Sequence, residues 1–423
     1  MVKKLQACIV ILFLILAIIP AASLSATGEP VVTDTKTDII YPNSIRFSLS
    51  ANSNEDITDV RLYYTVERTS FAEIYSEVSL RYEKQKQVDV SWSWDFRYTG
   101  GLPPGTEITY WWTVEDEGGD VTRTEPQKVT YSDNRYEWES INQDNVTIYW
   151  YEGSDSFAEE LMGTAQGALE RLVEDIGAYL KEEVEIYIYA SADALRQSMV
   201  FPQEWTGGVA YPQYNTIAIG IAPSDLIWGK RAVVHELAHL VTYQMTTNPY
   251  STTPTWLNEG ISMYAEGALE YYFQDELDNA LKEDNLISVR SIASPFSALT
   301  EYSYLSYAES YSIVEFLVEA YGQANLKKLL ETFAIGSSYD EALLNVYGFN
   351  MEGLNDVWQY HIKNPDVPIT PLNEIGEVIE QGFEEAVEEI EEHGIVILIT
   401  VIGIAVIVIA FSTAVLIRRR RHG

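Results

Sequence analysis

The chain has 423 residues, of which 27 are basic and 63 acidic, so its formal net charge is −36. Its 47% hydrophobic and 12% aromatic content is too high for a disordered acidic protein, and predicts two or three packed domains. The acidic balance excludes nucleic acid as a partner, because binding phosphates needs a basic face. The single cysteine, Cys8, lies in the N-terminal leader, so the rest of the chain has no disulfides, cysteine zinc fingers or thiol catalysis.

Residues 1–26 have the layout of a secretory signal peptide. Lys3 and Lys4 precede a 14-residue apolar run at 7–20, and small residues follow up to Ala26. This order predicts cleavage within residues 23–26. An uncleaved anchor is the alternative, although the apolar run is shorter than the about 20 residues that span a bilayer.

Residues 27–133 alternate apolar and polar side chains. The runs at 45–49, 60–66, 88–94 and 108–114 have period two, and glycine and proline turn signals separate them. Short alternating runs of this kind predict an antiparallel β-sandwich, which resembles an immunoglobulin or fibronectin type III module without its disulfide. No motif in it indicates chemistry, so we expect a spacer or docking role.

Residues 134–365 predict an α+β domain. Strands are expected at 146–151, 184–190 and 216–221, with a helix after the first of them that begins at Ser154 or Asp155. After Pro223 the apolar spacing is almost wholly helical. Strands followed by helices are typical of this fold class.

The C-terminal end predicts a membrane anchor. Residues 394–417 form an uncharged run of 24 residues followed by four arginines at 418–421, which predicts a transmembrane helix with a basic cytoplasmic tail at 418–423 and the domains outside the cell. Without the leader and tail, the external part has a net charge of −42. Residues 366–393 predict an acidic helical stalk whose apolar stripe pairs with another chain, lies on its own ectodomain, or is simply solvated.

One motif carries chemistry. His235 and His239 stand four residues apart in a helical context, so both imidazoles lie on one helix face and reach one zinc at about 2.1 Å. Glu236 follows the first histidine, where it can accept a proton from water without binding the metal itself. The alternative, a chance pair of core or solvated histidines, does not explain the fourth member of the pattern.

That fourth member is Glu259, in the segment Trp-Leu-Asn-Glu-Gly at 256–260. Hydrolytic zinc sites need a third protein ligand and one open position. Glu259 lies 20 residues after His239 and just after a helix start at Pro254. This distance leaves room for a loop and a helix that returns a carboxylate to the metal.

This pattern resembles the gluzincin metallopeptidases of the thermolysin and aminopeptidase N kind, and above all the peptidase MA-like domain of surface proteins. The resemblance covers residues 134–364 and implies a zincin-like fold. It implies one Zn²⁺ per chain held by His235, His239 and Glu259, with Glu236 as general base. It further implies that Tyr307 donates to the oxyanion, although ordinary packing is the alternative for any one of 29 tyrosines.

The resemblance also bears on where substrates are cut. Aminopeptidase relatives hold the substrate amine with a glutamate just before an edge strand, expected here at 216–221, to which a peptide adds. This sequence has Tyr211 at the matching position, with Glu204 as the alternative acid. We therefore predict a membrane-anchored surface zinc endopeptidase acting on peptides or proteins. The alternatives are an aminopeptidase, a hydrolase of a non-peptide bond, and a non-catalytic binding or adhesion protein.

Overall fold

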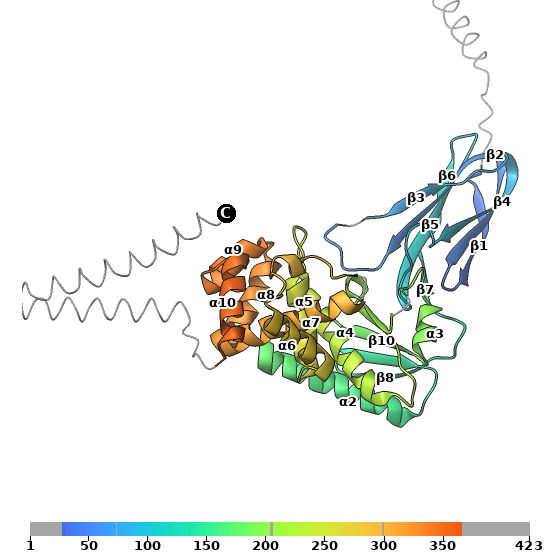
Figure 1. Cartoon of the computed structure of the whole chain (residues 1–423). Coiled ribbons are helices and arrows are strands. Elements are labelled where there is room, and N and C mark those ends of the chain that lie inside the picture. Colours follow the sequence, from blue (N-terminus) through green and yellow to red (C-terminus); the bar gives the residue numbers. More distant parts are fainter. Residues whose placement is uncertain (1–27, 73, 204–205, 298–299, 366–423) are drawn as a thin grey trace, which may run out of the picture. The chain divides into compact units, whose positions relative to one another are not determined.

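The computed structural model describes residues 28–365 except 73, 204–205 and 298–299 (Figure 1). The predicted signal peptide, stalk, transmembrane helix and basic tail lie outside these residues. Among the described residues, none of the helices has the length and apolar character needed to cross a bilayer. The described chain divides into two compact units, residues 28–139 with 189–207 and residues 140–188 with 208–365.

The first unit is a β-structure organised around one long strand. Its strands are β1 (Val31–Ile40), β2 (Ser44–Val66), β3 (Ser76–Ser79), β4 (Gln85–Asp95), β5 (Thr106–Asp116), β6 (Val121–Arg123) and β7 (Gln127–Tyr131). The first half of β2 pairs antiparallel with β1 and β4, and its second half pairs antiparallel with β3 and β5. The pairing shifts register after Asn52, so one strand contributes to two sets of neighbours.

The core of this unit follows the predicted alternation. Ile45, Phe47 and Leu49 on β2 are at most 2% exposed, and Trp112 on β5 is fully buried. Since the side chains of a strand point alternately to opposite faces, one face of each strand supplies the core. The prediction of an all-β domain is confirmed, whereas its immunoglobulin-like topology stays a prediction.

Residues 189–207 group with the first unit although the sequence pattern favours the second. The hydroxyl of Tyr189 donates to the buried carboxylate of Asp133 at 3.2 Å. Arg135 donates to the backbone carbonyl of Gln197 at 3.1 Å. This segment contains the short helix α3 (Ala192–Arg196), and no local pattern marks its tertiary partners.

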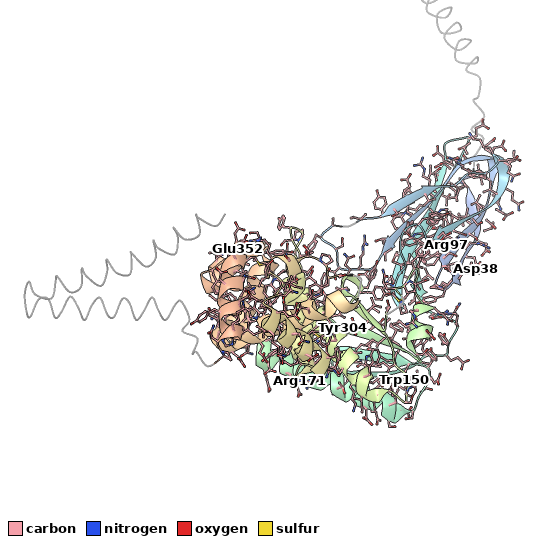
Figure 2. All side chains as sticks on the ribbon, in the orientation of Figure 1. Asp38, Arg97, Trp150, Arg171, Tyr304 and Glu352 are labelled. Atoms are coloured by element: carbon pink, nitrogen blue, oxygen red, sulfur yellow. The ribbon has the colours of Figure 1, made fainter. Side chains whose placement is uncertain are left out.

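The second unit contains a five-stranded sheet in the order β11-β12-β10-β9-β8. The strands are β8 (Glu139–Gln143), β9 (Val146–Trp150), β10 (Val184–Tyr189), β11 (Gly208–Tyr211) and β12 (Thr216–Gly220). β9 and β10 are parallel, and β11 and β12 are antiparallel. Figure 2 labels Trp150, the buried last residue of β9.

One prediction about this sheet is wrong. The strand expected at 216–221 to be the edge is β12, which lies between β11 and β10. The 3₁₀ turn Pro212–Tyr214 reverses the chain, so that Gly208–Tyr211 pairs with residues 216–219 and becomes the outer strand. The edge strand on this side of the sheet is therefore β11, and β8 is the edge strand on the other side.

Helices make up the rest of the second unit, as predicted. They are α2 (Asp155–Arg171) with a π-helical end (Leu172–Ile176), α4 (Leu226–Thr246), α5 (Thr255–Glu266), α6 (Tyr271–Glu283), the 3₁₀ turn Ser291–Ala293, α7 (Thr300–Tyr321), α8 (Gln323–Ala334), α9 (Tyr339–Tyr347) and α10 (Met351–Lys363). The buried faces of α2, α4, α5 and α7 share one core with β9, β10 and β12. The α+β class predicted for this part of the chain is confirmed.

Candidate metal centre

Helix α4 presents the two histidines and the glutamate between them. The helix begins after Asp225. One of its faces packs in the core, with Val233, Leu237 and Val241 fully buried. This packing fixes the rotation of the helix about its axis. His235 and His239 therefore both project from the face of α4 that is not packed in the core. Their ring centroids are 4.7 Å apart.

Helix α5 brings Glu259 to these histidines. It begins after Pro254, as predicted, and Trp256 and Leu257 anchor its first turn in the core. A Cβ on Gly260 would lie 2.3 Å from the backbone carbonyl oxygen of Ser310 on α7. The glycine after Glu259 therefore lets α5 approach α7 closely, which sets the position of the carboxylate.

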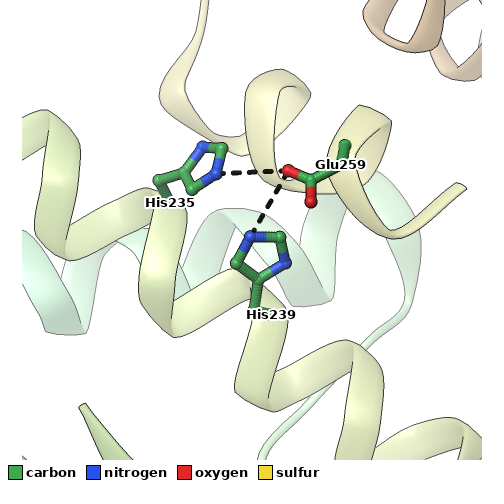
Figure 3. Close-up of side chains that lie close together, drawn as sticks. All are labelled: His235, His239 and Glu259. Carbon is green, nitrogen blue, oxygen red and sulfur yellow. Dashed lines mark ion pairs between the residues drawn. The ribbon is translucent and has the colours of Figure 1, made fainter. Parts of the chain in front are cut away.

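The three predicted ligands converge on one point (Figure 3). The Oε2 atom of Glu259 lies 3.5 Å from Nε2 of His235 and 3.5 Å from Nε2 of His239. Two ligand atoms on one tetrahedral zinc at about 2.1 Å would be about 3.4 Å apart. Together with the donor set of two imidazoles and one carboxylate, these separations fit zinc. Among the residues that the structure describes, this is the one such group of potential metal ligands.

Two further residues of α5 fix the histidine rings. His235 Nδ1 lies 2.7 Å from Oε1 of Glu266, and His239 Nδ1 lies 3.0 Å from Oγ of Ser262. Binding a metal through Nε2 requires the proton on Nδ1, so each histidine donates to its partner. Neither residue was predicted from the sequence. The pattern that indicates them is the spacing of residues 259, 262 and 266, which places all three on one face of α5.

The charges of the side chains at this site favour a cation. Burial lowers the pKa of His235, but its hydrogen bonds to Glu259 and Glu266 outweigh burial and raise the pKa to about 10. Burial likewise opposes ionisation of Glu259, yet the charges of His239 and His235 lower its pKa. The carboxylates therefore stabilise positive charge between them, which a divalent ion supplies.

Glu236 lies on the same helix but faces the sheet edge. A Cβ on Gly208, the first residue of β11, would be 2.8 Å from Oε1 of Glu236. A side chain at position 208 would therefore push the Glu236 carboxylate out of this place. Burial raises the pKa of Glu236, against the charges of the two histidines and a hydrogen bond from the backbone of Ala210.

Two of the predicted tyrosine positions lie near these carboxylates. Burial, followed by the charges of Glu259 and Glu236, raises the pKa of the Tyr307 phenol, so the phenol stays protonated at neutral pH. Burial and the charge of Glu236 also raise the pKa of Tyr211, to about 12. Tyr304, labelled in Figure 2, instead packs against Tyr272 and Phe273.

A buried acid on α7, Glu309, contacts the segment after α6. Glu309 is fully buried, and one of its oxygens accepts a hydrogen bond of 2.8 Å from the backbone N–H of Ile287. Burial raises its pKa to about 8. Glu309 is therefore protonated at neutral pH and ties α7 to the segment after α6.

Comparison with known proteins finds a family match in this unit. Residues 164–364 match the Peptidase MA superfamily, a range that includes all the residues placed at the site. No curated protein matches the sequence. Solved structures include OgpA from Akkermansia muciniphila, with 15% identity, a TM-score of 0.21, 25% of this chain covered and 28% of that one. Another is an M1 zinc metallopeptidase from Deinococcus radiodurans, with 15% identity, a TM-score of 0.35, 75% of this chain covered and 89% of that one.

The chain thus spans less than a third of the length of OgpA. Because the TM-scores and identities of both structures are low, the family assignment rests on the match over residues 164–364.

Proposed function

Residues 164–364 form a metallopeptidase domain of the Peptidase MA superfamily, and from that premise we propose that this chain hydrolyses peptide bonds with zinc as its cofactor. The gluzincin family predicted from the sequence is confirmed by the match. One observation carries the proposal about activity. A single oxygen of Glu259 faces Nε2 of both His235 and His239 at 3.5 Å, and Glu236 follows His235 directly.

The proposed chemistry divides between the metal and the chain. A zinc ion held by His235, His239 and Glu259 would polarise the scissile carbonyl and acidify water at the open position. Glu236 then accepts the proton of the attacking water and passes it to the leaving amine. A purely adhesive domain has no use for this glutamate, which argues against the non-catalytic alternative.

Tyr307 is the proposed donor to the oxyanion. Its phenol keeps its proton at neutral pH, and its pKa responds to the charges of both Glu259 and Glu236. A donor aimed at charge that develops in the transition state stabilises that state more than the substrate. The packing of its ring against Phe273 and Phe296 holds the phenol in place.

We propose cleavage of internal peptide bonds because Tyr211 stands at the position where aminopeptidases carry the glutamate that holds the substrate amine. Tyr211 lies near Glu236 and carries no charge at neutral pH, so it cannot neutralise an ammonium. The alternative acid, Glu204, lies outside the described residues. The edge strand β11 would offer main-chain hydrogen bonds to an extended peptide. Such bonds fix the position of the peptide along the strand and depend little on its sequence.

The test compares a peptide with its N-acetylated twin, with and without a zinc chelator. We expect equal, chelator-sensitive cleavage of both peptides at one internal bond, read by mass spectrometry. Stepwise loss of N-terminal residues that acetylation abolishes would instead establish an aminopeptidase. If the fully zinc-loaded protein cleaves no peptide of a diverse library, the non-catalytic binding protein is the reading that remains.

We also propose that the enzyme acts at the outer surface of the cell membrane. The support is the sequence of the two ends, with the uncharged run at 394–417 followed by four arginines. A protease added to intact cells is expected to release a soluble fragment that contains both units and ends near residue 366. Resistance of both units until the cells are lysed would refute this topology.

A further inference from the structure

We propose that Arg231 is a positioning residue of the metal centre, which holds the Glu266 carboxylate so that Glu266 can fix the ring of His235. This inference rests on the proposed function only in taking the site to bind zinc. Arg231 lies one turn before His235 on α4, and therefore on the same face of the helix. No step of the proposed chemistry uses it.

The contacts divide the Glu266 carboxylate between two partners. Its Oε1 atom lies 2.7 Å from Nδ1 of His235. Its Oε2 atom accepts from Nε of Arg231 at 3.0 Å and lies 2.9 Å from Nη2 of the same guanidinium. With both oxygens held, the carboxylate cannot rotate away from the imidazole, so Nε2 of His235 keeps its direction toward Glu259.

The location of Glu266 explains why a cation is needed there. It is the last residue of α5, where the helix dipole disfavours negative charge. Its side chain is only 10% exposed, so water gives little compensation. A guanidinium stabilises this carboxylate and meets it with a rigid planar fork, which an ammonium cannot do.

The arrangement is specific to one histidine. His239 has the neutral hydroxyl of Ser262 as its Nδ1 partner, with no charged group in that contact. Arg231 also approaches Glu270, at 3.5 Å, through its remaining nitrogen. Glu270 touches neither histidine in these contacts, and it therefore offers a matched control for loss of an ion pair with Arg231.

The experiment measures metal binding by the purified full-length chain. Zinc affinity is determined by competition with a chromophoric chelator, and Co²⁺ loading is followed by its visible spectrum. The variants are Arg231→Met, Arg231→Lys, Glu266→Gln, the double variant R231M/E266Q, and Glu270→Gln. We expect E266Q to weaken zinc binding by about 10- to 100-fold, the range known for groups that orient metal ligands. R231M should weaken it by more than twofold and by no more than E266Q does, because Arg231 acts through Glu266.

The other variants and the Co²⁺ spectrum give further expected results. R231K should restore part of the affinity, E270Q should keep wild-type affinity, and R231M/E266Q should bind no more weakly than E266Q, because both changes break one chain of contacts. The Co²⁺ spectrum should change in R231M and stay unchanged in E270Q. If R231M does not fold, R231K and E266Q still give the comparison.

Zinc affinity of R231M and R231K within twofold of wild type would overturn the inference, whatever their melting temperatures. Additive losses in the double variant would also overturn it, because Arg231 would then act independently of Glu266. None of these measurements uses hydrolysis. A chain that binds zinc as expected but cleaves no peptide would refute the proposed function and leave the role of Arg231 intact.

Discussion

Glu236→Gln is expected to lower kcat by about 10²- to 10⁴-fold while leaving the fold and the bound zinc unchanged. The substitution preserves shape and removes only the proton acceptor. The carboxylate fits against Gly208, where a Cβ would lie 2.8 Å from it, so an amide of the same size should occupy the same space. Initial rates on the internally cleaved peptide, at matched zinc content, measure the effect.

Glu309→Gln is the matched control for this substitution. Glu309 is also buried, but burial raises its pKa to about 8, so it is already neutral at pH 7. A glutamine there can still accept the hydrogen bond from Ile287, and kcat should stay unchanged. Wild-type rates in both variants would rule out Glu236 as the general base.

The parts of the site that sequence could predict depend on regular local geometry. His235 and His239 share a helix, and a spacing of four residues places them on one face whatever surrounds that helix. Glu259 follows at a distance that fits a loop and a returning helix. The alternation in β2, β4 and β5 likewise assigns the buried faces before any tertiary contact is known.

The parts of the site that the sequence could not predict depend on how helices and strands pack against one another. Ser262 and Glu266 share one face of α5 with Glu259, but that face gains its meaning only when α5 packs against α4 and brings both side chains to the Nδ1 atoms of the histidines. Glu309 stands two residues from Tyr307 and resembles any helical glutamate in the sequence, yet it is fully buried. No periodicity distinguishes such a residue from an exposed one on the same helix.

The sequence pattern also could not predict which strand, β11 or β12, lies at the edge of the sheet. The run at 216–221 is apolar and regular, whereas β11 has only four residues and begins with a glycine. A reversal of three residues, Pro212–Tyr214, places the shorter strand outside. Substrate geometry at the site thus depends on a turn whose consequence appears only in the folded sheet.

Glu259→Ala is expected to remove one of three zinc ligands and to abolish hydrolysis at physiological zinc levels. Groups that only orient a ligand contribute about 10- to 100-fold to metal affinity, so the loss of a direct ligand should exceed about 100-fold. Glu259 carries the oxygen that faces both histidines at 3.5 Å, and no other described carboxylate joins that group.

Glu270→Ala, which removes another acid that contacts Arg231, is the control for a general loss of negative charge. Elemental analysis after dialysis against buffered zinc should give one zinc per chain for wild type and Glu270→Ala, and much less for Glu259→Ala. If the Glu259→Ala chain retains one zinc at wild-type affinity, Glu259 is not a ligand, and the proposed site loses the residue that distinguishes it from a chance pair of histidines.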